Sequence, residues 1–152
     1  MFRSNNIFTN KERKDLLYKS IPLVKHIPEH PAKQTRADLH YNLDFNLYHQ
    51  IIMKRIKDMV FIDLKIVRSW INEDWGRKED ISWHNHDSFY SCVYYLKTIP
   101  FFNSGTLFKD YGFVRAKQNS LLLFPSHLVH GTPSYPFPFI KRYTLVMELI
   151  LQ

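Results

Sequence analysis

The sequence predicts a mainly β protein with helices near its N-terminus. Aromatic residues make up 16% of its 152 residues, and aromatic side chains are enriched in β-strands. After Ile81, turn-forming Gly, Pro, Asn and Ser residues divide the chain into short apolar segments. This pattern is typical of β-sandwiches and β-barrels. Before Val60, in contrast, one long stretch has its apolar residues at the spacing of an α-helix.

Residues 1–40 predict an irregular arm, because Pro22, Pro28 and Pro31 prevent a continuous helix. Within this arm we expect one short helix, at residues 11–19. The next stretch, DFNLYHQIIMKRIKDMV, predicts an amphipathic helix lying against a sheet, since basic residues separate apolar positions that recur at helical spacing. These apolar positions are Leu47, Ile51, Ile52, Ile56 and Met59.

From Val60 the apolar period changes to two, which predicts a strand that ends at a turn-rich break, residues 72–80. Further strands are expected at residues 82–86, 91–97, 106–108, 113–117, 121–124, 128–131 and 142–151. The sequence contains no internal repeat and no low-complexity linker. We therefore expect a single domain, residues 1–152, in which a helical and irregular arm (1–58) packs on a β core (59–152).

The composition excludes several classes of protein. A hydrophobic content of 45% with 23% charged residues argues against disorder over most of the length. Cys92 is the only cysteine, which excludes an internal disulfide and a cysteine-based zinc site. A metal ion would therefore need His, Asp or Glu ligands. The sequence also lacks the apolar stretches of a signal peptide or a membrane span, so we expect a soluble cytoplasmic protein with no membrane partner.

The formal net charge of +7 raises the question of a polyanionic partner such as nucleic acid. Lys and Arg are spread along the chain and form no basic block of the kind that follows a phosphate backbone. We therefore favour a solvated basic surface over a nucleic-acid-binding surface.

Several histidines and an Arg–Thr pair together predict a metal site next to a carboxylate site. His84 and His86 lie two apart at the start of the β region, so in a strand their side chains point to the same face. His127 and His130 follow a later apolar strand, and Arg142 begins the last one, with Thr144 two residues on. Imidazoles suit iron, copper, nickel or zinc. A guanidinium beside a hydroxyl suits a bound carboxylate.

The segments HNHDSFYSCVYYLK, LLLFPSHLVHG and KRYTLVMEL carry this pattern in order. In this respect the chain resembles the iron(II)- and 2-oxoglutarate-dependent oxygenases, in particular a His-x-His branch of bacteria and phages. The resemblance covers residues 83–149 and implies a double-stranded β-helix, a jelly-roll or cupin-like fold. The N-terminal part of the chain has no counterpart in it.

The resemblance implies a role for each residue. His84, His86 and His130 would be the catalytic metal ligands for Fe(II), and Arg142 with Thr144 would bind the far carboxylate of 2-oxoglutarate. Of the adjacent Tyr94 and Tyr95, the one that faces inward would line the cosubstrate pocket. We predict that it is Tyr94. His127 would face away from the site, because it lies three residues before His130.

The chain departs from the family pattern at three positions. His86 stands where most members have Asp, and Asp87 could replace it only if the strand bulges. Cys92 and Asn119 both stand where Gly is usual. The change at Asn119 is mild, since Asn tolerates positive φ.

The resemblance therefore predicts a dioxygenase that uses O₂ and 2-oxoglutarate to hydroxylate an unidentified small molecule or peptide. Two alternatives stay open. One is a cupin-like three-histidine metalloprotein that does not use 2-oxoglutarate and gives Arg142 no role in catalysis. The other is a basic binding module without catalysis, in which the histidines are structural.

Overall fold

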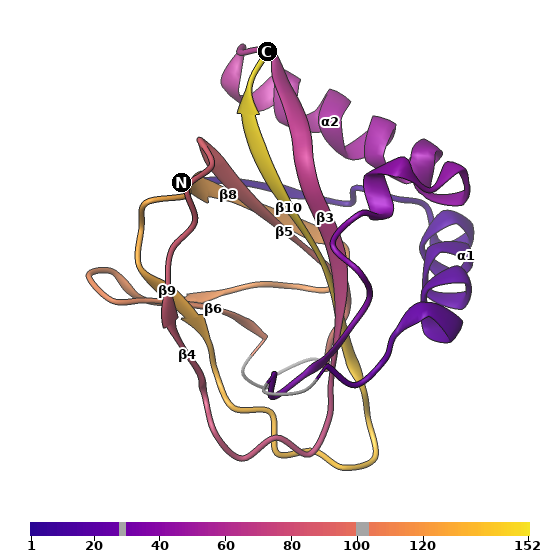
Figure 1. The fold of residues 1–152 in the computed structure, drawn as a ribbon, viewed down its shortest axis with the longest axis vertical. Coiled ribbons are helices and arrows are strands. Elements are labelled where there is room, and N and C mark those ends of the chain that lie inside the picture. Colours follow the sequence, from indigo (N-terminus) through magenta and orange to yellow (C-terminus); the bar gives the residue numbers. More distant parts are fainter. Residues whose placement is uncertain (28–29, 100–103) are drawn as a thin grey trace.

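Two β-sheets face each other and form the body of the molecule (Figure 1). The computed structural model describes residues 1–27, 30–99 and 104–152. The larger sheet has six strands in the order β1-β8-β5-β10-β3-β2, and the smaller has four in the order β4-β9-β6-β7. The strands are β1 (Phe2–Asn5), β2 (Lys33–Gln34), β3 (Leu64–Asp74), β4 (Ile81–His84), β5 (Tyr90–Lys97), β6 (Gly105–Phe108), β7 (Gly112–Arg115), β8 (Ser120–Pro125), β9 (His130–Thr132) and β10 (Arg142–Leu151).

Two α-helices cover the outer face of the larger sheet (Figure 1). Helix α1 (Asn10–Ser20) begins at a capping box, in which Thr9 and Glu12 satisfy each other's backbone N–H groups. Helix α2 (Asn46–Val60) buries Ile52 and Ile56 of the predicted apolar stripe and partly buries Ile51 and Met59, whereas Leu47, which the stripe included, is exposed. Short 3₁₀ turns connect these elements at Ile21–Leu23, Leu39–Tyr41 and Leu43–Phe45. Both predicted helices are confirmed within about two residues, the usual uncertainty of a helix end.

Strand β10 lies in the middle of the larger sheet, and its alternate side chains point to the two faces of that sheet. It pairs with β3 on one side and β5 on the other, in antiparallel register. Its odd-numbered residues, such as Leu145 and Met147, join the core beneath the helices. Its even-numbered residues point between the sheets, where Arg142 and Thr144 line a cavity. Since side chains alternate along a strand, this parity decides which residues can reach the site.

The hydrophobic core has two parts. The larger part lies between the helices and the six-stranded sheet and includes Leu16, Ile52 and Tyr94. A smaller part, formed by Tyr95, Phe108, Leu122 and Phe124, lies between the two sheets. The smaller core fills one end of the space between the sheets, and the cavity extends from Tyr95 toward β3 and β10.

The structure differs from the expected strand pattern at three places. Strand β3 continues through Asp74, so residues 72–74 belong to a strand and not to a turn. Strands β1 and β2 were not expected; they are short edge strands from the N-terminal arm. Their few residues lack the alternation that identifies a half-buried strand. Asn119 has φ 63°, as the turn preceding β8 requires. Among the described residues, no helix has the length and hydrophobicity needed to span a bilayer.

Candidate metal centre

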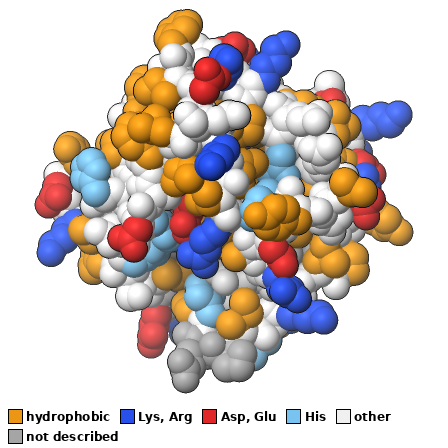
Figure 2. Space-filling model, turned by 45° about the horizontal axis from the view of Figure 1, so that its top comes forward, with side chains coloured by type: hydrophobic (Ala, Val, Ile, Leu, Met, Phe, Trp, Pro, Cys, Tyr) orange, Lys and Arg blue, Asp and Glu red, His pale blue; other side chains and the backbone are white. Residues whose placement is uncertain are grey.

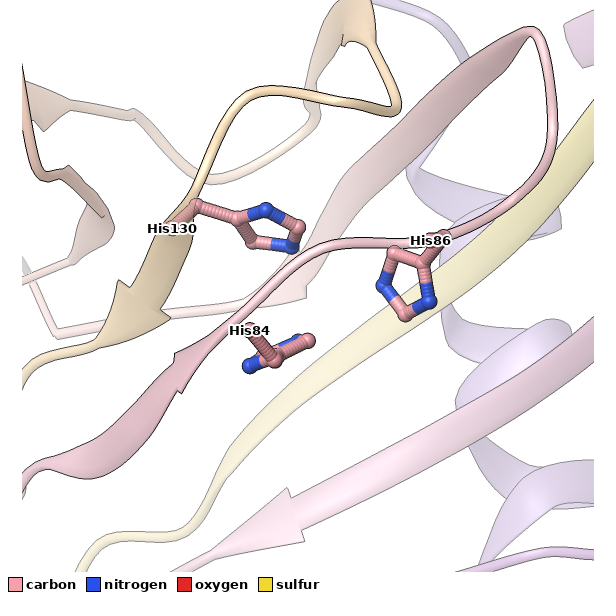
Figure 3. A group of neighbouring side chains, drawn as sticks. All are labelled: His84, His86 and His130. Carbon is pink, nitrogen blue, oxygen red and sulfur yellow. The ribbon is translucent and has the colours of Figure 1, made fainter.

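Three histidines gather between the sheets. One ring nitrogen of each of His84, His86 and His130 lies within 4.8 Å of the others. The ring centroids are 4.5 Å apart for His84 and His130, 5.1 Å for His84 and His86, and 5.3 Å for His86 and His130. Figure 3 shows the three rings grouped around a common space. The structure thus brings together the three histidines that the sequence nominated.

Strand pairing places these histidines side by side. His84 on β4 is the direct register partner of His130 on β9. The close approach of the two strands depends on Gly131, because a Cβ there would lie 2.7 Å from the carbonyl oxygen of Ile81. His86 lies just beyond the end of β4, and its backbone N–H donates to the carbonyl of Ser126 at 3.0 Å. This bond keeps His86 on the same face as His84.

Each ring has one nitrogen that is already hydrogen-bonded. Nδ1 of His84 lies 2.9 Å from the carbonyl oxygen of Ser82, and Nδ1 of His130 lies 2.8 Å from that of Leu128. Nδ1 of His86 lies 3.0 Å from a carboxylate oxygen of Glu148. Because these oxygens accept hydrogen bonds, each Nδ1 is the donor of its contact. Nε2 is then the nitrogen of each ring that remains to bind a metal ion.

Burial keeps two of these rings neutral. It lowers the pKa of His130 to about 4, and it also lowers the pKa of His84 below its ordinary value. A metal ion binds only the deprotonated nitrogen, so a low pKa reduces competition from protons. Near neutral pH both rings are therefore in the form that binds metal.

Glu148 was not nominated from the sequence, although it contacts the histidine group. The same carboxylate oxygen, Oε1, lies 3.0 Å from Nδ1 of His86 and 3.2 Å from a guanidinium nitrogen of Arg68. Burial alone would raise the pKa of Glu148, but its hydrogen bond to His86 and the nearby charges lower it below the usual value. The sequence held a signal for it, since Glu148 has the same parity as Arg142 and Thr144 in an otherwise apolar strand.

The cavity beside the histidines has a volume of 380 Å³, and Arg142 lines it together with all three of them. The Arg142 side chain is 1% exposed, and its Nε and Nη2 donate to Asp74 Oδ2 at 3.1 and 2.5 Å. Arg77 donates to the other oxygen of Asp74 at 3.0 Å. Burial alone would raise the pKa of Asp74, but the two guanidinium charges hold it below the usual range. Tyr135 also packs on Arg142, with its ring centroid 5.1 Å from the guanidinium carbon.

Thr144 lines the cavity two residues beyond Arg142, as predicted. Its hydroxyl oxygen accepts a long hydrogen bond, 3.5 Å, from the side-chain amide of Asn72, whose own oxygen accepts from Gln34 at 2.7 Å. Gln34 belongs to the N-terminal arm and also lines the cavity. The arm therefore forms part of the wall, a contribution that the sequence did not predict.

The prediction for the adjacent tyrosines must be corrected. Tyr94 points into the core beneath the helices, where its hydroxyl donates to the side chain of Asn119 at 2.8 Å. Tyr95 is the one that lines the cavity, and its hydroxyl lies 2.7 Å from that of Thr106. Because β5 is buried on both faces, its sequence lacks the polar alternation that would have identified the inward residue.

The two other candidates near the motif lie outside the histidine group. His127 is exposed, in agreement with the prediction that it is not a ligand. Asp87 is exposed as well, and among the described residues the group of potential ligands does not include it. On the face shown in Figure 2, Lys and Arg side chains are scattered among acidic and hydrophobic ones, as the sequence led us to expect.

No protein-family model and no curated protein matches the chain. Solved structures do. The chain is similar to an oxidoreductase of the 2OG-Fe(II) oxygenase family from Burkholderia pseudomallei, with a TM-score of 0.74 and 17% identity, over 97% of this chain and 81% of that one.

Two further structures give similar agreement. HygX from Streptomyces hygroscopicus, with nickel and 2-oxoglutarate bound, has a TM-score of 0.73 and 11% identity, over 99% of this chain and 82% of that one. The 2OG complex of the viral collagen prolyl hydroxylase vCPH from Paramecium Bursaria Chlorella virus-1 has a TM-score of 0.72 and 12% identity, over 99% and 96%. These likenesses establish the fold: a double-stranded β-helix, as in the 2OG-Fe(II) oxygenases, here with three clustered histidines.

Proposed function

We propose that this protein is an Fe(II)- and 2-oxoglutarate-dependent oxygenase. One observation carries the proposal: in a double-stranded β-helix, the three clustered histidines and the buried Arg142 line the same cavity. The metal ligands and the carboxylate-binding residue proposed from the sequence therefore share one space.

The donor set fits a divalent transition metal. Three neutral imidazoles suit Fe(II), and three protein ligands leave coordination positions open for a cosubstrate and O₂. His84, His86 and His130 would hold the metal through their Nε2 atoms. When bound, iron would activate O₂, the oxidant of both the substrate and 2-oxoglutarate, and 2-oxoglutarate would be oxidised to succinate and CO₂.

Arg142 and Thr144 would bind the far carboxylate of 2-oxoglutarate. A guanidinium and a hydroxyl on one face of β10 can donate to the same carboxylate. Asp74 holds the Arg142 guanidinium in place, so this side chain would lose less conformational entropy when the carboxylate binds. Tyr95 lines the same cavity and takes the place that the sequence gave to Tyr94.

The residues around the histidines would position the substrate and exclude water. Trp70, Val93 and Val146 provide apolar wall next to polar groups such as Gln34. We propose hydroxylation of a small molecule or peptide as the reaction. The similar structures differ in their substrates: HygX was also determined with hygromycin B bound, and vCPH is named as a collagen prolyl hydroxylase. The fold is therefore compatible with several substrates.

Anaerobic titration tests the proposal. Fe(II) followed by 2-oxoglutarate should produce the weak visible charge-transfer band of a chelated keto acid, and Arg142→Ala should abolish it. Thr144→Val, which removes one hydroxyl and keeps the shape, should weaken 2-oxoglutarate binding less than Arg142→Ala does. Succinate formed on admission of O₂ should then be measured with a panel of substrates. If metal binds and 2-oxoglutarate gives no band, the proposal is wrong.

A second candidate function is a three-histidine metalloprotein that does not use 2-oxoglutarate. The ion pair between Arg142 and Asp74 favours it, because the guanidinium already has a carboxylate partner inside the protein. This candidate predicts that metal binding does not change the affinity for 2-oxoglutarate. The oxygenase predicts that 2-oxoglutarate binds much more tightly when the metal is present.

A further inference from the structure

We propose that Glu148 is a positioning residue of the metal centre, which orients His86 and raises its affinity for the metal. The inference rests on the proposed metal site, and it assigns a role to a residue outside the ligand set. Glu148 is buried, with 5% of its surface exposed, and among the described residues it lies outside the group of potential ligands. It would therefore act through His86 and not by direct coordination.

The position of Glu148 follows from the register of β10. Arg142, Thr144, Val146 and Glu148 alternate with core residues, so all four point between the sheets. Glu148 is the register partner of Arg68 on β3, and the regular pairing of the two strands is interrupted directly after it. These four residues of β10 thus extend from the proposed carboxylate-binding pair, Arg142 and Thr144, to Glu148, which contacts the Nδ1 side of His86.

His86 depends on Glu148 more than the other histidines depend on their own partners. His84 and His130 each donate to a carbonyl two residues earlier in their own segment, so local backbone fixes their rings. His86 lies beyond the end of β4, and the Nδ1 contact that holds its ring comes from a side chain on another strand. Without that carboxylate, rotation of the ring would move Nε2 away from the other two nitrogens.

Charge gives a second reason for the dependence. Three neutral imidazoles bring no negative charge to a divalent cation. The Glu148 carboxylate lies directly behind one of them, where it makes the imidazole a stronger donor. Arg68 contacts the same oxygen at 3.2 Å and holds the carboxylate toward His86. Its side chain is 56% exposed, so water screens part of its opposing charge.

The alternative is that Glu148 has a purely structural role and only stabilises the fold through its ion pair with Arg68. The two roles differ in one measurable respect. If Glu148 acts through His86, its removal must weaken metal binding only while His86 is present. If it serves only the fold, its removal should change stability by the same amount in both backgrounds and leave metal affinity unchanged in the folded protein.

The test is a double-mutant cycle on the full chain with cobalt(II) as the probe, which is stable in air and has visible absorption. Affinity is measured by competition with a chelating dye for wild type, Glu148→Leu, Glu148→Gln, His86→Ala and the double variant His86→Ala/Glu148→Gln. Glu73→Gln is the matched control, since Glu73 is a buried carboxylate on the same sheet that pairs with Lys141. Circular dichroism of the metal-free variants confirms that each is folded.

We expect Glu148→Leu to weaken cobalt binding about 10- to 100-fold, the usual cost of losing such a partner. Glu148→Gln should lose less, because its amide oxygen can still accept from Nδ1, and the cobalt absorption should shift in both variants. Glu148→Gln should cost nothing further in the His86→Ala background, and Glu73→Gln should bind like wild type. If Glu148→Leu is unfolded, the cycle with Glu148→Gln decides alone.

Wild-type affinity in folded Glu148→Leu, or an equal loss from Glu148→Gln with and without His86, would overturn the inference. Cobalt is titrated without 2-oxoglutarate, so the two proposals can fail separately. A dependence on Glu148 in a protein that never binds 2-oxoglutarate would keep the positioning role and reject the oxygenase. A wild-type protein that binds no cobalt would reject both.

Discussion

Asp74→Asn should strongly destabilise the protein, because Asp74 is the carboxylate between two buried guanidinium groups. The Arg142 side chain is 1% exposed, that of Arg77 6% and that of Asp74 3%, so none of these charges has water as an alternative partner. Removal of one member of a buried ion pair costs about 3–5 kcal/mol. Asparagine keeps an oxygen that can accept one hydrogen bond, so we expect the lower end, about 3 kcal/mol.

Urea unfolding followed by circular dichroism measures this loss. With a typical slope of about 2 kcal/mol per M urea, a loss of about 3 kcal/mol lowers the midpoint by about 1.5 M. The pKa of Asp74 lies below its ordinary value of 3.8, so this stabilisation is present at neutral pH and is lost only as the pH falls below that value. Wild type and Asp74→Asn should therefore converge in stability in strong acid.

Glu73→Gln provides the comparison for this experiment. Glu73 is equally buried, but its charged partner Lys141 has 44% of its side chain exposed and can turn to water, and the buried Tyr143 hydroxyl that donates to Glu73 could still donate to the oxygen of a glutamine. We expect a loss of about 1 kcal/mol, typical of a replaceable hydrogen bond. If Asp74→Asn loses no more than Glu73→Gln, the two guanidinium groups do not depend on Asp74, and the argument that Asp74 holds Arg142 in place is refuted.

Three further outcomes follow from the packing. Gly105→Ala should lower stability by about 1–3 kcal/mol in urea unfolding, because a Cβ there overlaps the backbone oxygen of Val114 on the paired strand; an unchanged midpoint would show that β6 and β7 can separate freely. Burial lowers the pKa of His49 to about 4 from 6.5, so as the pH falls the unfolded chain takes up this proton before the folded protein does. Between these two pH values the free energy of unfolding of wild type should therefore fall by about 3 kcal/mol relative to that of His49→Gln. Parallel pH profiles of the two proteins would contradict this. Cys92 is fully buried and burial raises the pKa of its thiol, so a disulfide reagent should modify it only after unfolding, and rapid labelling of the folded protein would show that the core opens.

The histidine group could be predicted because its signal is local. The spacing of two predicted that His84 and His86 share a face; they do, although β4 ends at His84 and not at residue 86 as expected, and the resemblance then added His130. The parity of β10 likewise placed Arg142 and Thr144 in one cavity. For Arg142 and Thr144 the spacing along the chain was sufficient, since strand geometry leaves a side chain only two directions.

The rest depended on contacts between distant segments. The choice between Tyr94 and Tyr95 failed because both faces of β5 are buried, so either parity fits the sequence. Asp74 resembled part of a turn because its neighbours are charged, and only its pairing with Arg142 makes it a buried strand residue. The contribution of Gln34 to the cavity wall depends on the pairing of β2 with β3, which a two-residue strand does not reveal.

Metal content of the purified protein after anaerobic loading with Fe(II) tests most directly whether the three histidines form one metal site. Wild type should retain one ion per chain, and His130→Ala should lose it. His127→Ala removes an exposed histidine three residues away and should retain the ion fully. Equal metal content in the two variants would contradict the site, as would a wild-type chain that retains no metal.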